Sequence, residues 1–169
     1  MKGYVHIYTG DGKGKTTAAL GLAMRSLMRG RKVFMGQFIK GMYYGELDLQ
    51  KSFENLTIHQ YGTDCFIDRA PSEEDRRRAE KGLAELGEVL RGDWDVVILD
   101  EVCVAVDFSL LTWEAVKAVL DGRNPETEVV LTGRGATEEM IVYADLVTEM
   151  REVKHYYQEG VQARAGIEF

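Results

Sequence analysis

The strongest constraint on the fold is a glycine- and lysine-rich segment near the start of the chain, TGDGKGKTT at residues 9–17. A short apolar strand pattern at residues 5–8 precedes it, and a helical pattern at residues 16–29 follows it. Strand, glycine-rich loop and helix in this order are typical of a phosphate-binding loop. The glycines let the backbone bring its N–H groups against phosphate oxygens, and the positive end of the helix dipole points to the same place.

Two side chains of this loop are suited to nucleotide chemistry. We expect Lys15 to reach the terminal phosphates and the Thr16 hydroxyl to ligate Mg²⁺. Thr9 stands where the common phosphate-loop pattern has its first glycine, which indicates a somewhat different phosphate grip. A glycine-rich turn with solvated lysines is the alternative interpretation. The predicted nucleotide-binding residues of the loop are Thr9, Gly10, Asp11, Gly12, Lys13, Gly14, Lys15, Thr16 and Thr17.

Short apolar runs alternate with helical patterns along the rest of the chain. Strands are expected at residues 32–39, 56–61, 95–100, 128–131 and 146–150, and helices at residues 72–91, 113–120 and 138–143. This alternation predicts right-handed βαβ crossovers and an α/β fold with a mostly parallel sheet flanked by helices. Because no repeat or composition break interrupts the chain, residues 1–169 are predicted to form one domain.

Composition and charge narrow the partners. Lys and Arg total 21 and Asp and Glu total 28, which gives a net charge of −7. Nucleic acid is therefore not expected as a partner, because that affinity comes mostly from neutralising phosphates. No apolar run approaches the roughly 20 residues of a membrane span, and the start lacks the apolar core of a signal peptide. Cys65 and Cys103 form no CxxC pair and are expected to be free thiols, so we predict a cytoplasmic protein without a membrane partner.

Further candidate residues follow two buried strands. Asp100 and Glu101 come at the carboxyl end of the 95–100 strand, the edge where parallel sheets bind ligands. Asp100 is placed like the acid that holds Mg²⁺ in phosphate-loop enzymes, whereas Glu101 is suited to contact the metal, the ribose or a reacting group. Two acids that merely end a strand are the alternative. Arg134 follows the 128–131 strand and is expected on the same rim, where it meets phosphate charge or pairs with an acid.

Several motifs taken together resemble one family, the phosphate-loop ATP:corrinoid adenosyltransferases of the cobalamin pathway. Besides the loop they are QFIKG at residues 37–41, LDE at 99–101, LTGR at 131–134, ADLVTEM at 144–150, KH at 154–155 and GVQARAGIE at 160–168. The match runs from about Tyr4 to Phe169, and the unusual Thr9 is shared with that family. The resemblance implies a RecA-like phosphate-loop NTPase fold, usually as a homodimer.

The activity that the resemblance implies is adenosylation of a corrinoid. Co(I) of the corrinoid attacks the 5′ carbon of ATP and expels tripolyphosphate, with Co(I) supplied by an electron-donating reductase such as a flavoprotein. The implied substrates and cofactors are ATP, Mg²⁺ and the corrinoid. The implied catalytic residues are Lys15, Glu101 and Arg134, the implied metal-binding residues are Thr16, Asp100 and Glu101, and Gln37, Lys40 and Phe66 join the loop in binding nucleotide or corrinoid.

The chain departs from the family pattern in two places. Phe66 is the one aromatic where members usually carry a pair that crowds out the lower ligand of cobalt. Longer members also have an N-terminal extension that helps cover the site, so we expect a partner or the tail to close it here.

Two other classes of function share part of this pattern. A small-molecule kinase or ATPase would use Lys15, Thr16 and Asp100 but transfer the γ-phosphoryl group and form ADP. A non-catalytic ATP- or corrinoid-binding module would bind nucleotide without forming a Co–C bond. A nucleic-acid-dependent ATPase fits least, because the charge is −7.

Overall fold

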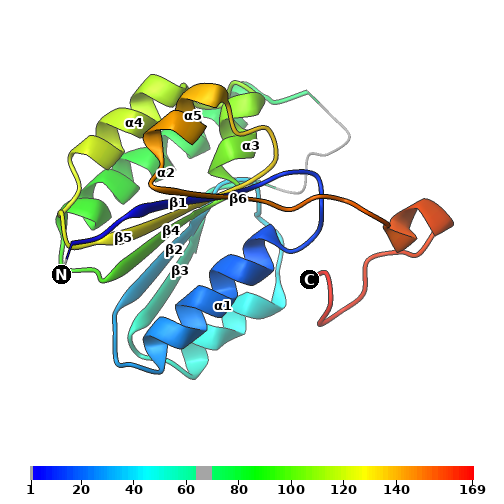
Figure 1. Cartoon of the computed structure of the whole chain (residues 1–169), viewed down its shortest axis with the longest axis horizontal. Coiled ribbons are helices and arrows are strands. Elements are labelled where there is room, and N and C mark those ends of the chain that lie inside the picture. Colours follow the sequence, from blue (N-terminus) through cyan, green and yellow to red (C-terminus); the bar gives the residue numbers. More distant parts are fainter. Residues whose placement is uncertain (1, 64–69) are drawn as a thin grey trace.

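The computed structural model describes residues 2–63 and 70–169, which form a three-layer α/β fold (Figure 1). The strands of this part of the chain form one sheet in the order β3-β2-β4-β5-β1-β6, with every neighbouring pair parallel. The strands are β1 Val5–Thr9, β2 Val33–Gln37, β3 Leu56–Gln60, β4 Val96–Asp100, β5 Glu128–Thr132 and β6 Leu146–Glu149. The predicted α/β class with a parallel sheet is confirmed, and the arrangement agrees with a RecA-like phosphate-loop fold.

Helices cover both faces of the sheet (Figure 1). One face carries α1 Lys15–Leu27 and the 3₁₀ helix η1 Gly45–Lys51, and the other carries α2 Glu73–Arg91, α3 Val102–Asp107, α4 Trp113–Asp121 and α5 Glu138–Tyr143. Each face has its own apolar core, and the strand residues alternate between the two cores. Both faces of the central strands are therefore buried, as a parallel sheet requires, whereas the residues of the edge strand β6 are exposed.

Local sequence explains the clearest elements. Ser72 caps α2, because its hydroxyl accepts from the Asp75 N–H while the Asp75 carboxylate accepts from the Ser72 N–H at 2.8 Å. All five residues of β4 are buried, which explains the uninterrupted apolar run. The short helices α3, η1 and η2 Tyr156–Glu159 were not predicted, although α5, which is as short as α3, was predicted at residues 138–143.

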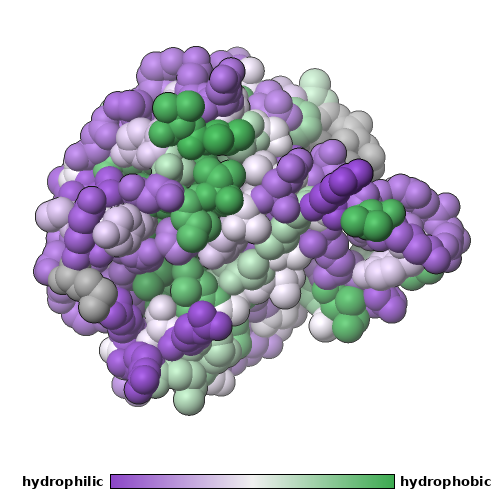
Figure 2. Space-filling model, viewed as in Figure 1, coloured by the Kyte–Doolittle hydropathy of each residue, from purple (hydrophilic) through white to green (hydrophobic). Residues whose placement is uncertain are grey.

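The chain ends in a tail, residues 151–169, that leaves the body of the molecule and returns toward the amino end of α1 (Figure 1). Most of its residues are exposed, and its surface is largely polar in Figure 2. The tail contacts the phosphate loop, as described below, and so lies at the mouth of the sheet. Among the residues that the structure describes, no helix has the length and apolar character to cross a membrane.

Sheet order determines which side chains can meet. β5 lies between β1 and β4, and β2 lies on the other side of β4, so the carboxyl ends of four strands adjoin. Register places Gln37 of β2 opposite Asp100 of β4, and Tyr8 of β1 opposite Thr132 of β5. The loop that follows β1 therefore lies at the carboxyl ends of the strands, as do Asp100, the last residue of β4, and Glu101, which follows it.

Candidate active site

The phosphate loop, residues 10–14, is a tight turn between β1 and α1. Gly14 is the N-cap of α1 with φ of 117°, a left-handed conformation that glycine adopts without strain. The Gly12 N–H donates to the Met150 carbonyl oxygen at 2.6 Å, and a Cβ at Gly12 would lie 2.6 Å from that oxygen. The loop is therefore packed against the end of β6, and no side chain fits at position 12.

Thr9 ties the start of this loop to a neighbouring connection. Its hydroxyl accepts a hydrogen bond from the Ala136 N–H at 3.4 Å, and its carbonyl accepts from the Met150 N–H at 2.8 Å. A glycine at this position, as in the common pattern, would lack the first of these contacts. The threonine thus links β1 to the β5–α5 connection.

Lys15 is folded back over the loop. Its Nζ donates to the carbonyl oxygens of Gly10 at 2.7 Å and Gly12 at 2.8 Å, and the residue is only 8% exposed. Burial lowers the pKa of the Lys15 ammonium, while the Glu101 carboxylate acts in the opposite direction. An ammonium held at the amino end of a 13-residue helix concentrates positive potential over the loop.

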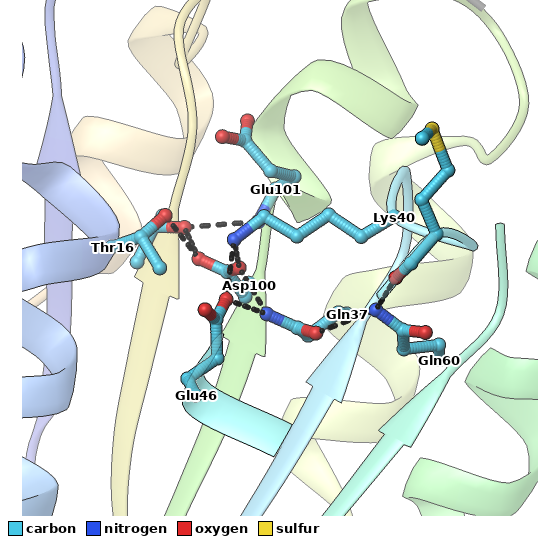
Figure 3. Close-up of polar contacts among 9 residues, drawn as sticks. Thr16, Gln37, Lys40, Glu46, Gln60, Asp100 and Glu101 are labelled. Atoms are coloured by element: carbon cyan, nitrogen blue, oxygen red, sulfur yellow. Dashed lines mark hydrogen bonds and ion pairs between the residues drawn. The ribbon is translucent and has the colours of Figure 1, made fainter. Parts of the chain in front are cut away.

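Asp100 is fully buried and has four polar neighbours (Figure 3). Its Oδ1 accepts from the hydroxyls of Thr16 at 2.8 Å and Thr132 at 2.7 Å. Its Oδ2 accepts from Gln37 Nε2 at 3.1 Å and forms an ion pair with Lys40 Nζ, also at 3.1 Å. These contacts fix the carboxylate in orientation and place it beside the first turn of α1.

Glu101 begins α3 in a conformation that is uncommon for a side-chain-bearing residue. Its φ is 59°, and its N–H donates to the Thr132 hydroxyl at 2.9 Å. Burial raises the pKa of Glu101, the negative charge of Asp100 adds to this effect, and the nearby cations oppose it. Strained backbone and a perturbed carboxyl together are typical of functional sites.

Lys15, Thr16 and Glu101 border one cavity of about 620 Å³. Its lining combines the phosphate loop, Glu101 and Arg134 with His155 and the last four residues of the tail. Lys13 Nζ donates to the Ile167 carbonyl at 3.0 Å, and Arg134 Nη2 donates to the Asp11 carbonyl at 3.4 Å. Both cations are exposed, so the tail and Arg134 meet the loop at the entrance of the cavity.

The predicted site residues can now be placed. Gly12, Lys13, Gly14, Lys15, Thr16, Thr17, Lys40, Glu101 and Arg134 line the cavity. Thr9, Gly10, Asp11, Gln37 and Asp100 lie behind or beside that lining. Phe66 lies outside the described residues. The roles assigned to these side chains stay predictions.

Sequence reasoning missed Glu46, Gln60 and the role of Thr132 in this network. Glu46 Oε1 accepts from Gln37 Nε2 at 2.9 Å and from Lys40 Nζ at 3.0 Å. Gln60 Nε2 donates to Gln37 Oε1 at 3.1 Å. Thr132 belongs to the LTGR motif at residues 131–134, which marked it in the sequence. Glu46 lies in a short 3₁₀ helix, and its local sequence does not distinguish it from a surface acid.

Comparison with known proteins agrees with this geometry. A sequence model of the family described as ATP:corrinoid adenosyltransferase BtuR/CobO/CobP matches residues 1–169. A corrinoid adenosyltransferase of a Sinorhizobium species is 36% identical over 173 residues, which cover 99% of this chain and 81% of the relative. The corrinoid adenosyltransferase of Escherichia coli strain K12 is 34% identical over 177 residues, covering 99% of this chain and 86% of the relative. The corrinoid adenosyltransferase of Pseudomonas aeruginosa is 36% identical over 171 residues, which cover 99% of this chain and 84% of the relative. Since these matches span almost the whole sequence, the chain belongs to the ATP:corrinoid adenosyltransferase family.

Proposed function

We propose that this protein transfers the 5′-deoxyadenosyl group of ATP to the Co(I) centre of a corrinoid and releases tripolyphosphate. The observation that carries the proposal is one cavity, in a member of this family, that combines a phosphate loop and a buried lysine with the Glu101 carboxylate. Lys15 and Thr16 suit a polyphosphate and its metal ion, and Glu101 faces the same space.

The reaction consists of one displacement at carbon. The cobalt–C5′ bond forms with two electrons from Co(I), which becomes Co(III), while the C5′–oxygen bond breaks and tripolyphosphate leaves with that bond's electron pair. No proton moves at the reacting carbon, so no general base is required. The demand on the protein is to stabilise the charge that accumulates on the departing triphosphate.

The phosphate loop meets that demand. The Lys15 ammonium donates to two carbonyl oxygens of the loop, at 2.7 and 2.8 Å, and phosphate oxygens are stronger acceptors for it. The loop N–H groups and the amino end of α1 act on the same charge without rearrangement. Lys13 and Arg134 stand at the entrance and extend the positive field outward.

Mg²⁺ fits the oxygen-rich side of this cavity. The Thr16 hydroxyl, 2.8 Å from Asp100 Oδ1, and the Glu101 carboxylate are oxygen ligands of the kind this ion prefers. When bound, the ion supplies charge neutralisation of the triphosphate. The Thr132 hydroxyl donates a hydrogen bond to Asp100 Oδ1 and accepts one from the Glu101 N–H, so Thr132 helps to position both acids.

The remaining requirement is to orient C5′ in line with cobalt and to keep water away. Two segments close the cavity. The tail residues 166–169 line it beside the loop, and a Cβ at Gly45, the first residue of η1, would lie 3.9 Å from Phe169. We infer that the tail and η1 together cover the nucleotide, that a separate electron donor supplies Co(I), and that the protein acts as a homodimer like the family it resembles.

The proposal is tested by an anaerobic assay with chemically reduced cobalamin, MgATP and excess reductant. Formation of a light-sensitive Co–C product, followed in the visible spectrum, supports adenosyl transfer. Nucleotide binding without this product would point to a carrier or sensor. Conversion of ATP to ADP without it would point to a kinase or ATPase.

A further inference from the structure

The most unusual contact near the site is a lysine held between two acids. Lys40 Nζ lies 3.1 Å from Asp100 Oδ2 and 3.0 Å from Glu46 Oε1 (Figure 3). All three side chains are largely buried, with exposed fractions of 13%, 0% and 11%. The Lys40 ammonium therefore has two alternative ion-pair partners, Asp100 and Glu46.

A glutamine spans the same two acids. Gln37 Nε2 donates to Glu46 Oε1 at 2.9 Å and to Asp100 Oδ2 at 3.1 Å. Its orientation is fixed from behind, because Gln60 Nε2 donates to Gln37 Oε1 at 3.1 Å and to the Met42 carbonyl at 3.0 Å. The two carboxylates are thus held at a set separation, and Lys40 lies in the space between them.

Lys40 carries its charge in this position. Burial by itself lowers the pKa of an ammonium, but Asp100 and Glu46 outweigh that effect and hold the pKa of Lys40 above its ordinary value. The centroid of the Tyr44 ring lies 4.8 Å from Lys40 Nζ, so a cation–π interaction also stabilises the charged form. Asp100 is therefore charge-balanced by Lys40 in this state, rather than left as an unpaired buried carboxylate.

A divalent ion on the Thr16 side of Asp100 changes that balance. Such an ion would neutralise the same carboxylate and would repel the ammonium that lies beside Oδ2. Lys40 then keeps one carboxylate, Glu46, to which it is already bonded. No large movement is needed, because the two acceptor oxygens are both within 3.1 Å of Nζ.

We propose that Lys40 is a displaceable counter-ion of Asp100. When a divalent metal ion binds to Asp100, Lys40 remains paired with Glu46 alone. Glu46 acts as a positioning residue, with Gln37 and Gln60 setting its distance from Asp100. The inference rests on the metal site of the proposed function and adds to it a link between metal binding and the 40–46 segment, where Lys40 and Tyr44 line the cavity.

The test is a double-mutant cycle that measures binding of Mn²⁺ alone, from the free-ion signal in electron paramagnetic resonance. In Lys40→Gln the competing charge is removed while a hydrogen-bond donor remains, so Mn²⁺ should bind about tenfold more tightly, the size of a coupling within one polar network. In Glu46→Gln the displaced lysine has no second carboxylate, so Mn²⁺ should bind about tenfold more weakly. The double variant should match Lys40→Gln, because Glu46 acts through Lys40.

The opposite results overturn the proposal. Unchanged or weaker Mn²⁺ binding in Lys40→Gln shows that Lys40 does not compete with the metal. A double variant that is weaker than Lys40→Gln by the full Glu46→Gln factor shows that Glu46 attracts the metal directly. Circular dichroism verifies the fold of each variant, and if Lys40→Gln does not fold, Glu46→Gln decides alone, with unchanged or tighter binding overturning the proposal.

Asp100→Asn and the adenosyl-transfer assay separate this inference from the proposed function. If wild-type protein and Asp100→Asn bind Mn²⁺ equally, or neither binds it, the metal site at Asp100 is wrong and the inference falls with it. If the wild-type protein transfers adenosyl and binds Mn²⁺ through Asp100 but the Lys40 and Glu46 variants bind it normally, the inference alone is wrong.

Discussion

The floor and the rim of the cavity differ in how firmly their side chains are held. We define the floor as Lys15 and Thr16, which line the cavity, together with Asp100 and Thr132 behind them. Each of these side chains has one to four polar contacts at 2.7–3.1 Å. The rim, defined as Lys13, Arg134 and tail residues 166–169, is mostly exposed. Within it Lys13 donates to the Ile167 carbonyl at 3.0 Å, and Arg134 donates to the Asp11 carbonyl of the loop at 3.4 Å. Fixed charges suit a triphosphate and a metal ion, whereas loosely held groups can rearrange around a bulky second substrate.

Removing the floor lysine should have the largest effect. In Lys15→Ala the departing triphosphate loses its buried cation, and adenosyl transfer should fall by about 10²–10³-fold or more, as for loss of a preorganised charge-stabilising donor. The rate of Co–C bond formation with saturating ATP measures this effect. A near-normal rate in a folded Lys15→Ala protein would mean that the floor does not bind the triphosphate.

The acid of the floor should come next. Asp100→Asn keeps the shape and an acceptor for Thr16 and Thr132 but removes the negative charge, so the Mg²⁺ concentration for half-maximal rate should rise by about tenfold or more. A Mg²⁺ titration of the transfer rate measures it, with Asp48→Asn, an exposed carboxylate of η1, as a matched control. An unchanged Mg²⁺ requirement would remove Asp100 from the metal site.

Changes on the rim should have smaller effects than changes on the floor. Arg134→Ala removes an exposed cation that makes one long hydrogen bond, and exposed charges contribute little to binding. We expect KM for ATP to rise by less than about tenfold with kcat nearly kept, which steady-state kinetics will show. A loss as large as that of Lys15→Ala would place Arg134 in the floor and contradict the division drawn here.

The smallest expected effect is on stability, at Glu101. Because its pKa is raised in the folded protein, ionised Glu101 destabilises the fold above that pKa, and the penalty disappears as the pH falls through it. Glu101→Gln should therefore raise Tm at pH 8 by roughly 2–4 °C, the shift that about 1 kcal/mol gives in a chain of this size. The gain should shrink toward acid pH in thermal unfolding curves. A variant that is less stable than wild type at pH 8 would show that the ionised carboxylate stabilises the fold.

Most of the floor was predictable from the sequence, as were Lys13 and Arg134 of the rim, whereas the contacts of the tail were not. Lys15 and Thr16 lie in one short motif between a strand and a helix, so local pattern was sufficient to place them. Asp100 lies near the loop because only β5 separates β4 from β1 in the sheet. The predicted parallel α/β fold put Asp100 at the carboxyl edge of the sheet but did not give the order of the strands. Glu46 required three-dimensional packing, because η1 brings it beside Gln37 and Lys40 and nothing in its local sequence marks it.

The tail illustrates the same limit. Its residues are mostly exposed and polar, so no periodicity predicts where it runs. The contact between Lys13 and the Ile167 carbonyl joins positions that are 154 residues apart. Such a contact depends on the complete fold rather than on local preference.

The most direct test of the central claim, that the floor holds a triphosphate that leaves as one unit, is to identify the phosphate product. The reaction contains wild-type protein, MgATP and chemically reduced cobalamin and is run without oxygen. The phosphorus products are then identified by their ³¹P nuclear magnetic resonance signals. Tripolyphosphate formed in step with the Co–C product is the predicted result. ADP with orthophosphate, or a Co–C product without tripolyphosphate, would contradict it.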